Sequence, residues 1–276
     1  MWVRTLSAKE KRLGTANLKY IIFASQLALT GLGTEPGDPL LKYEEPRVLT
    51  GRIYEKGAQG NGKNLLFTFS RNATRTGMKL NVLREYKYPD GNTAAREFVV
   101  YEGDNLVSYE LEELQIGARG RAAIRRDSKA SAKSRIDFEY SKNARSERKP
   151  ERDTEALQSD TLVNDMVGPF LVSHWDALNS GKEVKCRYIV VPRTETVGFT
   201  FRKQSESKWE ERSVIIVKMW ATSPVISALV DPGFFTMEKS EPHRVLSYVG
   251  RTTPKIHSGT HWKDLDALTV FDWEQH

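Results

Sequence analysis

Short stretches of the chain alternate between apolar and polar residues, which is the pattern of β-strands with one buried face. Between Val48 and Tyr140, aromatic residues flank a polar residue in Phe67–Phe69 and again in Phe138–Tyr140. Turn sequences separate these stretches. Tyr88–Gly91 is the strongest of them, because its proline has a fixed φ and its glycine accepts a left-handed conformation. This part of the chain is therefore predicted to form an antiparallel meander.

The apolar spacing changes from that of a strand to that of a helix at about residues 160–180. Asp160 is predicted to cap this amphipathic helix, and Gly168-Pro169 to kink or break it. A short helix is predicted at about residues 224–230, because Ser223-Pro224 offers a capping residue followed by proline at the first helical position.

Alternation returns after the long helix and continues to a last predicted hairpin, which ends at Tyr248 and is followed by a tail that packs back. The predicted fold is mainly β: one large curved antiparallel sheet, or an open or closed β-barrel, with the two helices. Residues 35–276 are predicted to form one domain of two halves, about 45–140 and 183–255. A charged, exposed loop at Ser141–Thr154 and the long helix join the halves.

Residues 1–34 have the order of a secretory signal. A basic stretch comes first, Lys19–Gly33 is largely apolar, and the turn-rich Thr34–Pro39 follows. The apolar stretch is shorter than the roughly 20 residues that span a bilayer. We therefore predict a targeting segment at 1–34 and a periplasmic or secreted protein. The alternative is a core helix in a cytoplasmic protein, because Ile21, Ala24, Ala28 and Leu32 also fall at helical spacing.

The formal net charge of +6 is unevenly distributed, since residues 1–34 hold five basic residues and one acidic residue. A second cluster, Arg119–Arg152, holds twelve Lys/Arg and five Asp/Glu. Basic residues interrupted by acidic ones are typical of a solvated strand edge or loop, which disfavours a nucleic-acid partner. A binder of nucleic acid or acidic surfaces through Arg125, Arg126 and Lys129 is kept as an alternative.

No catalytic, cofactor-binding or metal site is predicted, and no cofactor. The chain has no G-x-S-x-G, H-E-x-x-H or phosphate-binding glycine motif. Cys186, the single cysteine, alternates with polar neighbours and is interpreted as a small buried apolar residue. The alternative is an enzyme with an unrecognised site at His174 or at the carboxylates Glu110, Glu112 and Glu113, although Glu110 and Glu112 are interpreted as part of a solvated sheet face.

Aromatic residues are the best indication of a ligand. They could line the concave side of a curved sheet, with the long helix as a plug, and so bind an apolar molecule. The alternative is that they fill the core. The predicted groove residues are Phe67, Phe69, Tyr109, Phe138, Tyr140, Trp175, Tyr188, Phe199, Phe201 and Trp220.

Residues 45–255 resemble bacterial envelope proteins of unknown function that share an open-barrel β fold with lipoprotein carriers. The resemblance lies in the meander, in the helix end Asp176-Ala177-Leu178-Asn179-Ser180-Gly181-Lys182, and in the following strand with Tyr188 and Val190. It implies an extracytoplasmic protein with a hydrophobic groove for a lipid or an acyl chain, and peripheral association with the envelope. The function expected from the sequence is therefore non-enzymatic binding of a lipid or another apolar ligand.

Overall fold

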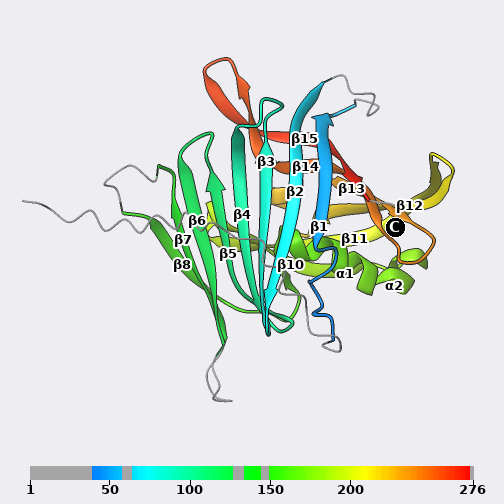
Figure 1. Ribbon diagram of the computed structural model, residues 1–276, viewed down its shortest axis with the longest axis horizontal. Helices are drawn as coiled ribbons and strands as arrows, with labels where there is room; N and C mark the ends of the chain where they lie inside the picture. Colours follow the sequence, from blue (N-terminus) through cyan, green and yellow to red (C-terminus); the bar gives the residue numbers. More distant parts are fainter. Residues whose placement is uncertain (1–38, 58–63, 127–133, 144–148, 274–276) are drawn as a thin grey trace, which may run out of the picture. The chain divides into compact units, whose positions relative to one another are not determined.

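The computed structural model describes residues 39–57, 64–126, 134–143 and 149–273 (Figure 1). The predicted targeting segment at 1–34 and Lys129 lie outside these residues. The strands of the first half are β1 (Val48–Glu55), β2 (Leu65–Thr76), β3 (Lys79–Lys87), β4 (Thr93–Glu102), β5 (Asn105–Glu113), β6 (Ala118–Arg125), β7 (Arg135–Ser141) and β8 (Glu151–Ala156).

The second half contains β9 (Thr161–Leu162), β10 (Val184–Val190), β11 (Glu195–Trp209), β12 (Arg212–Ala221), β13 (Gly233–Glu238), β14 (Val245–Ser258) and β15 (His261–Asp272). Its helices are the 3-10 turns η1 (Asn164–Met166) and η2 (Val191–Arg193), and the α-helices α1 (Val167–Ser173), α2 (Trp175–Asn179) and α3 (Pro224–Ser227). Among the described residues no helix is long and apolar enough to cross a membrane.

The described strands form one sheet of 15 strands, in the order β8-β7-β6-β5-β4-β3-β2-β1-β15-β14-β13-β12-β11-β10-β9. Neighbours are antiparallel except β9 and β10, which are parallel. The predicted mainly-β, antiparallel fold is confirmed. The sheet is open, because β8 and β9 are its two edge strands. The edge strand β8 contacts the second half of the sheet instead: Thr196 of β11 donates to the carboxylate of Glu155 in β8 from its backbone N–H at 3.1 Å and from its hydroxyl at 2.5 Å.

The turn predicted at Tyr88–Gly91 joins β3 to β4. The backbone N–H of Gly91 donates to the carbonyl of Tyr88 at 2.9 Å, and Gly91 has a φ of +88°. The Asp90 carboxylate accepts from the backbone N–H of Asn92 at 2.9 Å. Proline, aspartate and glycine therefore have the roles that their chemistry predicts.

The helix predicted at 160–180 is shorter than expected and divided. Thr161–Leu162 is strand β9, so Asp160 caps no helix, and the break falls at His174 between α1 and α2. Gly168 and Pro169 cause no break because they are the second and third residues of α1. The first N–H groups of a helix have no partner within it, so proline loses nothing there. The short helix α3 begins at Pro224 as predicted and ends at Ser227.

Two regions predicted to be irregular contain strands. The last four residues of the predicted charged loop, 151–154, belong to β8, whose side chains are nearly all exposed. A strand without a buried face has no apolar alternation to reveal it. The C-terminal tail forms β15, which pairs with both β14 and β1. Its inward positions include Ala267 and Thr269, which weaken the apolar signal.

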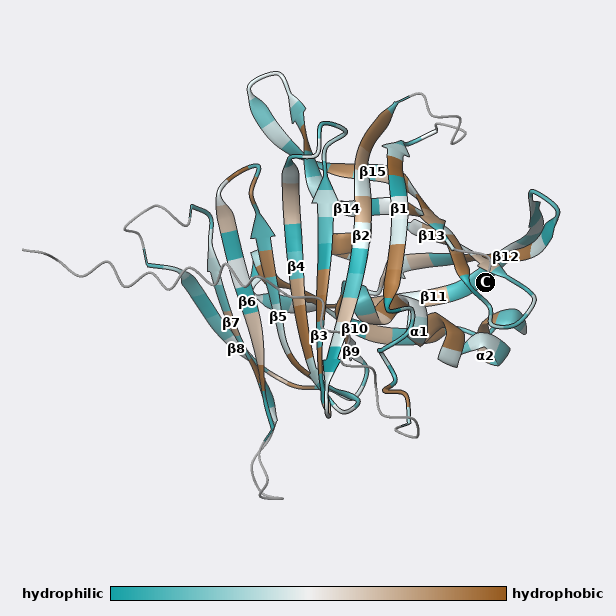
Figure 2. Ribbon diagram, in the orientation of Figure 1, coloured by the Kyte–Doolittle hydropathy of each residue, from teal (hydrophilic) through white to brown (hydrophobic). Residues whose placement is uncertain are grey.

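The main core lies between the two halves of the sheet. Tyr101 and Ile136 of the first half pack in one cluster with Phe201, Ile215 and Met237 of the second half, and all five are almost fully buried. In Figure 1 the strands β10–β14 cross behind β1–β8. Hydrophobic and hydrophilic residues alternate along β1–β6 in Figure 2, as expected for strands with one packed face.

Candidate ligand-binding cavity

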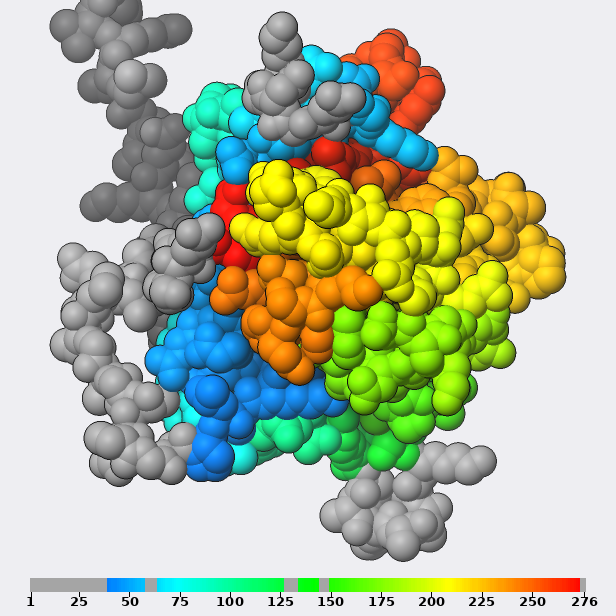
Figure 3. Space-filling model, turned by 90° about the vertical axis from the view of Figure 1, so that its right-hand side faces the viewer, coloured from blue at the N-terminus to red at the C-terminus, as the bar shows by residue number. Residues whose placement is uncertain are grey.

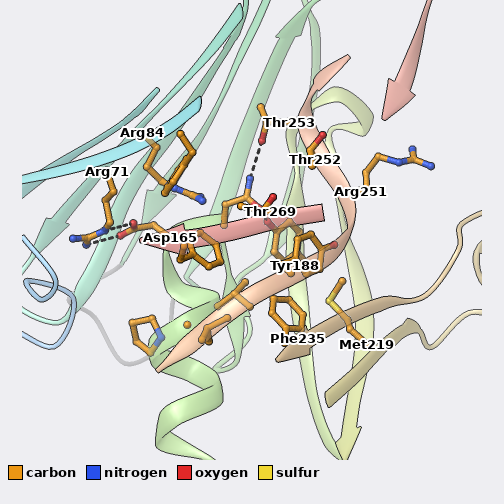
Figure 4. A pocket seen from close by; sticks show the side chains of 18 of the residues that line it. Arg71, Arg84, Asp165, Tyr188, Met219, Phe235, Arg251, Thr252, Thr253 and Thr269 are labelled. Carbon is orange, nitrogen blue, oxygen red and sulfur yellow. Dashed lines mark hydrogen bonds and ion pairs between the residues drawn. The ribbon is translucent and has the colours of Figure 1, made fainter. Parts of the chain in front are cut away.

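A cavity of about 1270 Å³ lies between the two halves of the sheet and α1. Much of its wall is apolar and comes from the second half: Ile189, Val191, Val197, Phe199, Met219, Phe235, Val245 and, from α1, Val167 and Val172. Side chains of Met219 and Phe235 lie across the cavity from Arg71 and Arg84 in Figure 4. In Figure 3 the segments that line its rim, near residues 42–49, 167–173 and 242–245, meet on one face.

The end of the cavity formed by β3 and β4 is polar. Arg84 and Glu97 lie opposite each other in these strands, and Arg84 Nη1 donates to Glu97 Oε2 at 2.7 Å. The other carboxylate oxygen, Oε1, accepts from Tyr86 at 3.2 Å, from Asn164 at 2.6 Å and from the Thr253 hydroxyl. Glu97 is fully buried behind Arg84, and Arg84 lines the cavity. Burial alone would lower the pKa of Arg84, but the Glu97 carboxylate outweighs it and raises that pKa.

Three tyrosines share this polar end: Tyr86, Tyr109 and Tyr188 all line the cavity. Burial, and next the negative charge of Glu97, raises the pKa of Tyr109 and of Tyr188 well above the usual value. Their hydroxyls are therefore neutral hydrogen-bond donors near neutral pH. Tyr188 donates to the side-chain oxygen of Asn164 in η1, which ties the second half of the sheet to the cluster around Glu97.

A buried ion pair fixes the rim. Arg71 of β2 donates to both carboxylate oxygens of Asp165 in η1, from Nε at 2.6 Å and from Nη2 at 3.1 Å. It also donates to the backbone carbonyls of Tyr43, Glu44 and Pro46. One guanidinium thus connects the segment before β1, strand β2 and η1. Pro46 and the residues after it line the cavity, so this pair positions part of its rim.

A second group of charges lies on β14 and β15. Arg251 pairs with Asp264 at 2.6 Å and with Asp266 at 2.9 Å. Lys255 pairs with the same Asp264 at 2.7 Å and with Glu113 of β5 at 3.2 Å. Each of these two cations therefore has two carboxylate partners already.

The structure brings four of the predicted groove residues to the cavity: Phe69, Tyr109, Tyr188 and Phe199. The other six lie elsewhere: Phe67, Phe138, Tyr140, Trp175, Phe201 and Trp220. Phe138 and Phe201 are core residues, and Phe67 packs on Tyr88 in a smaller cluster. Their phase along the strands is inward, but the inward surface of this sheet is partly core and partly cavity. That any of these residues binds a ligand stays a prediction.

The remaining three make other contacts. Tyr140 donates to Glu113 at 2.8 Å. Trp175 stacks on His243, with ring centroids 3.8 Å apart, and Trp220 lies against Arg202.

The residues of the enzyme alternative do not form one site. His174 packs on Phe170, and its Nδ1 lies 2.9 Å from the Phe170 carbonyl, away from the cavity. Glu110 and Glu112 also lie outside the cavity lining, whereas Glu113 lines it and is almost fully buried. The described residues contain no group of three or more metal-binding side chains placed to share an ion.

Four of the described basic residues of the cluster pair with a carboxylate of a neighbouring strand or its end. Arg125 lies 3.3 Å from Asp137, and Arg152 lies 3.2 Å from Glu139. Arg126 donates to the Leu106 carbonyl at 2.6 Å. Cys186 is buried, and burial raises the pKa of its thiol to about 12.

Sequence reasoning missed Arg84 and Glu97. The signal was present, because Leu80, Val82, Arg84 and Tyr86 have the same phase in β3. Glu97 likewise shares its phase with Val99 and Tyr101 in β4. Charged residues that continue an inward phase on two paired strands could have been predicted to face each other inside.

No protein-family model matches the chain, and no curated protein matches it either. Among solved structures, the chain is similar to the crystal structure of a β-barrel-like protein of domain of unknown function DUF1849 from Brucella abortus. That match has 7% sequence identity and a TM-score of 0.36, and covers 83% of this chain and 97% of that chain. The matched protein is described as β-barrel-like and of unknown function. The likeness to lipoprotein carriers stays a prediction.

Proposed function

We propose that this protein binds a lipid or another molecule with an acyl chain in the cavity, and that it does so without catalysing a reaction. The observation that carries the proposal is the cavity of about 1270 Å³ with its apolar wall from β10–β14 and α1. Ligand pockets typically measure about 300–1,000 Å³ and are lined mainly by apolar and aromatic side chains. Transferring a hydrocarbon chain from water to such a wall is favourable in proportion to the area buried.

The test is a series of saturated fatty acids of increasing chain length, with the dissociation constant measured by isothermal titration calorimetry. Each buried methylene contributes about 0.8 kcal/mol, so two more carbons should tighten binding by roughly 15-fold until the chain fills the cavity. A dissociation constant that does not change with chain length, or no binding at all, would refute the proposal.

A pair of matched variants locates the site. Met219→Trp places a larger ring in the cavity, which Met219 lines, and should weaken binding of the longest ligands first. Met78→Trp makes the same change at an exposed residue outside the cavity, and should bind as the unaltered protein does. Equal effects of the two substitutions would place the ligand elsewhere.

The proposal includes export to the periplasm or the medium. It is supported by the order of basic, apolar and turn-forming residues in 1–39. The mass of protein purified from its own host tests this point: a mature chain that begins near residues 31–38 is expected. An intact chain that begins at Met1 would exclude cleavage of a signal segment.

A further inference from the structure

Arg84 has one hydrogen-bond partner among the described residues, whereas Arg71, Arg251 and Lys255 of the cavity lining have two or more each. Its side chain is 12% exposed, and Nη1 donates to Glu97. A guanidinium carries five N–H donors. The other nitrogens of Arg84 make no hydrogen bond to any described residue, and none is among the buried polar atoms without a partner, so they are open to the cavity. The Phe69 ring lies 5.1 Å from Arg84 Cζ and covers one face.

Those three cations are engaged by carboxylates, and Arg244, a further cation of the lining, lies over the Trp273 ring. Arg71 donates to both oxygens of Asp165 and to three carbonyls, and Arg251 and Lys255 each have two carboxylate partners. The carboxylate of Glu97, by contrast, does not bind Arg84 alone. Its Oε1 accepts from Tyr86, Asn164 and Thr253, so its negative charge is shared among four donors. A second acceptor can therefore bind Arg84 from the cavity side.

A neutral donor accompanies Arg84. Tyr109 lines the same end of the cavity, and its hydroxyl, which makes no hydrogen bond to a described residue, is not among the fully buried polar atoms. Burial and Glu97 raise the pKa of Tyr109, so the hydroxyl keeps its proton near neutral pH. A group bound here meets one cationic donor and one neutral donor, with the apolar wall of the second half beyond them.

We propose that the ligand is a long-chain carboxylate whose head group binds Arg84 and Tyr109 and whose chain lies along Met219 and Phe235. This inference rests on the proposed function and specifies the chemical class of the ligand. The carboxylate offers acceptor oxygens that match the guanidinium, whereas the corresponding ester carries no charge. A charge-assisted hydrogen bond inside a cavity should favour the acid over the ester on the order of tenfold to a hundredfold.

The first test uses the unaltered protein, with palmitate and methyl palmitate as probes in the same calorimetric assay. Palmitate is expected to bind ten to a hundred times more tightly than its ester. Equal binding of both, or tighter binding of the ester, would overturn the carboxylate inference and leave apolar binding intact. No binding of either probe would refute the proposed function, and this inference with it.

The second test changes the protein while keeping each buried pair neutral. Arg84→Gln together with Glu97→Gln should reduce the preference for palmitate over its ester to near one. The matched control is Arg96→Gln with Glu85→Gln, a pair of the same residue types in adjacent register of the same two strands, with the side chains 2.9 Å apart and outside the cavity lining. The control should keep the full preference. If the Arg84→Gln, Glu97→Gln variant still prefers palmitate, Arg84 is excluded as the head-group contact. If that variant does not fold, the comparison of palmitate with its ester on the unaltered protein still tests the carboxylate inference.

Discussion

Asp165→Asn is expected to destabilise the protein far more than removal of an exposed carboxylate. Asp165 pairs with Arg71 through two hydrogen bonds of 2.6 and 3.1 Å, and accepts a third from the Tyr101 hydroxyl at 2.9 Å. The side chains of Asp165 and Arg71 are only 1% and 6% exposed. The substitution leaves the largely buried Arg71 charge without its counter-ion.

Removing one partner of a buried ion pair costs about 3–5 kcal/mol. For a domain of about 150–250 residues, each kcal/mol lowers the melting temperature by about 2–4 °C. Asp165→Asn should therefore lower it by about 6–20 °C. Glu139→Gln is the control, because Glu139 and its partner Arg152 are 52% and 69% exposed. Exposed pairs contribute about 0–1 kcal/mol, so the control should change the melting temperature by less than about 4 °C.

The assay is thermal unfolding followed by far-ultraviolet circular dichroism. Arg71→Met should also be strongly destabilising, because it leaves Asp165 and the carbonyls of Tyr43 and Pro46 without their donor. The double variant should lose less than the two single variants together, since neither charge then stays buried alone. A shift for Asp165→Asn no larger than that for Glu139→Gln would refute the role of this pair in fixing the rim.

Three further predictions concern single residues. Gly120→Ala should lower the free energy of unfolding, measured in urea, by about 1–3 kcal/mol, because a Cβ there would lie 2.4 Å from Val191 Cγ1 and 2.7 Å from a backbone carbonyl oxygen. Gly168→Ala, in α1 with open space around it, should raise the free energy of unfolding by about 0.5–1 kcal/mol. Burial alone would raise the pKa of Glu44, but the Leu41 N–H and Arg75 outweigh burial and lower that pKa. The contribution of the Glu44 carboxylate to stability should therefore be complete above about pH 4.3, the pKa of an unfolded glutamate, and lost as the pH falls through the lower pKa of the folded protein. Glu44→Gln should remove this part of the acid dependence of the melting temperature. Cys186 should not react with a thiol reagent at neutral pH in the folded protein and should react fully in denaturant, and rapid labelling of the folded protein would contradict its burial.

Local patterns predicted strands β2–β6 well because short turns join them. Tyr88–Gly91 carries the chemistry of a turn, and the strands on each side of it alternate. Those patterns failed where the deciding contact lies elsewhere. Gly168-Pro169 was predicted to break a helix, and only the position of the helix start shows that it is harmless there. Strand β8 has no apolar face, and its pairing with β7 alone defines it.

The cavity depends on contacts that no local pattern contains. Its polar end comes from β3 and β4, its apolar wall from β10–β14, and the pairing of β1 with β15 joins the two halves of the sheet. Thr50 lies opposite Asp272 in that pairing. A register so distant in sequence cannot be derived from alternation, because alternation gives the face of each residue and not its partner. For that reason the predicted groove residues include residues of the core, such as Phe201, residues of the cavity lining, such as Phe199, and Trp220, which lies against Arg202.

The two halves of the sheet supply different parts of the cavity, and this arrangement has a consequence for ligand specificity. An apolar wall recognises hydrocarbon by area and discriminates weakly between head groups. Buried polar groups discriminate strongly, because a ligand that lacks the matching group leaves them without a partner. Selectivity of this protein should therefore reside in Arg84 and its neighbours on β3 and β4, and affinity in the wall around Phe235. Since the two come from different halves, substitutions in the wall should change affinity for acid and ester alike, and only changes near Arg84 should alter the ratio between them.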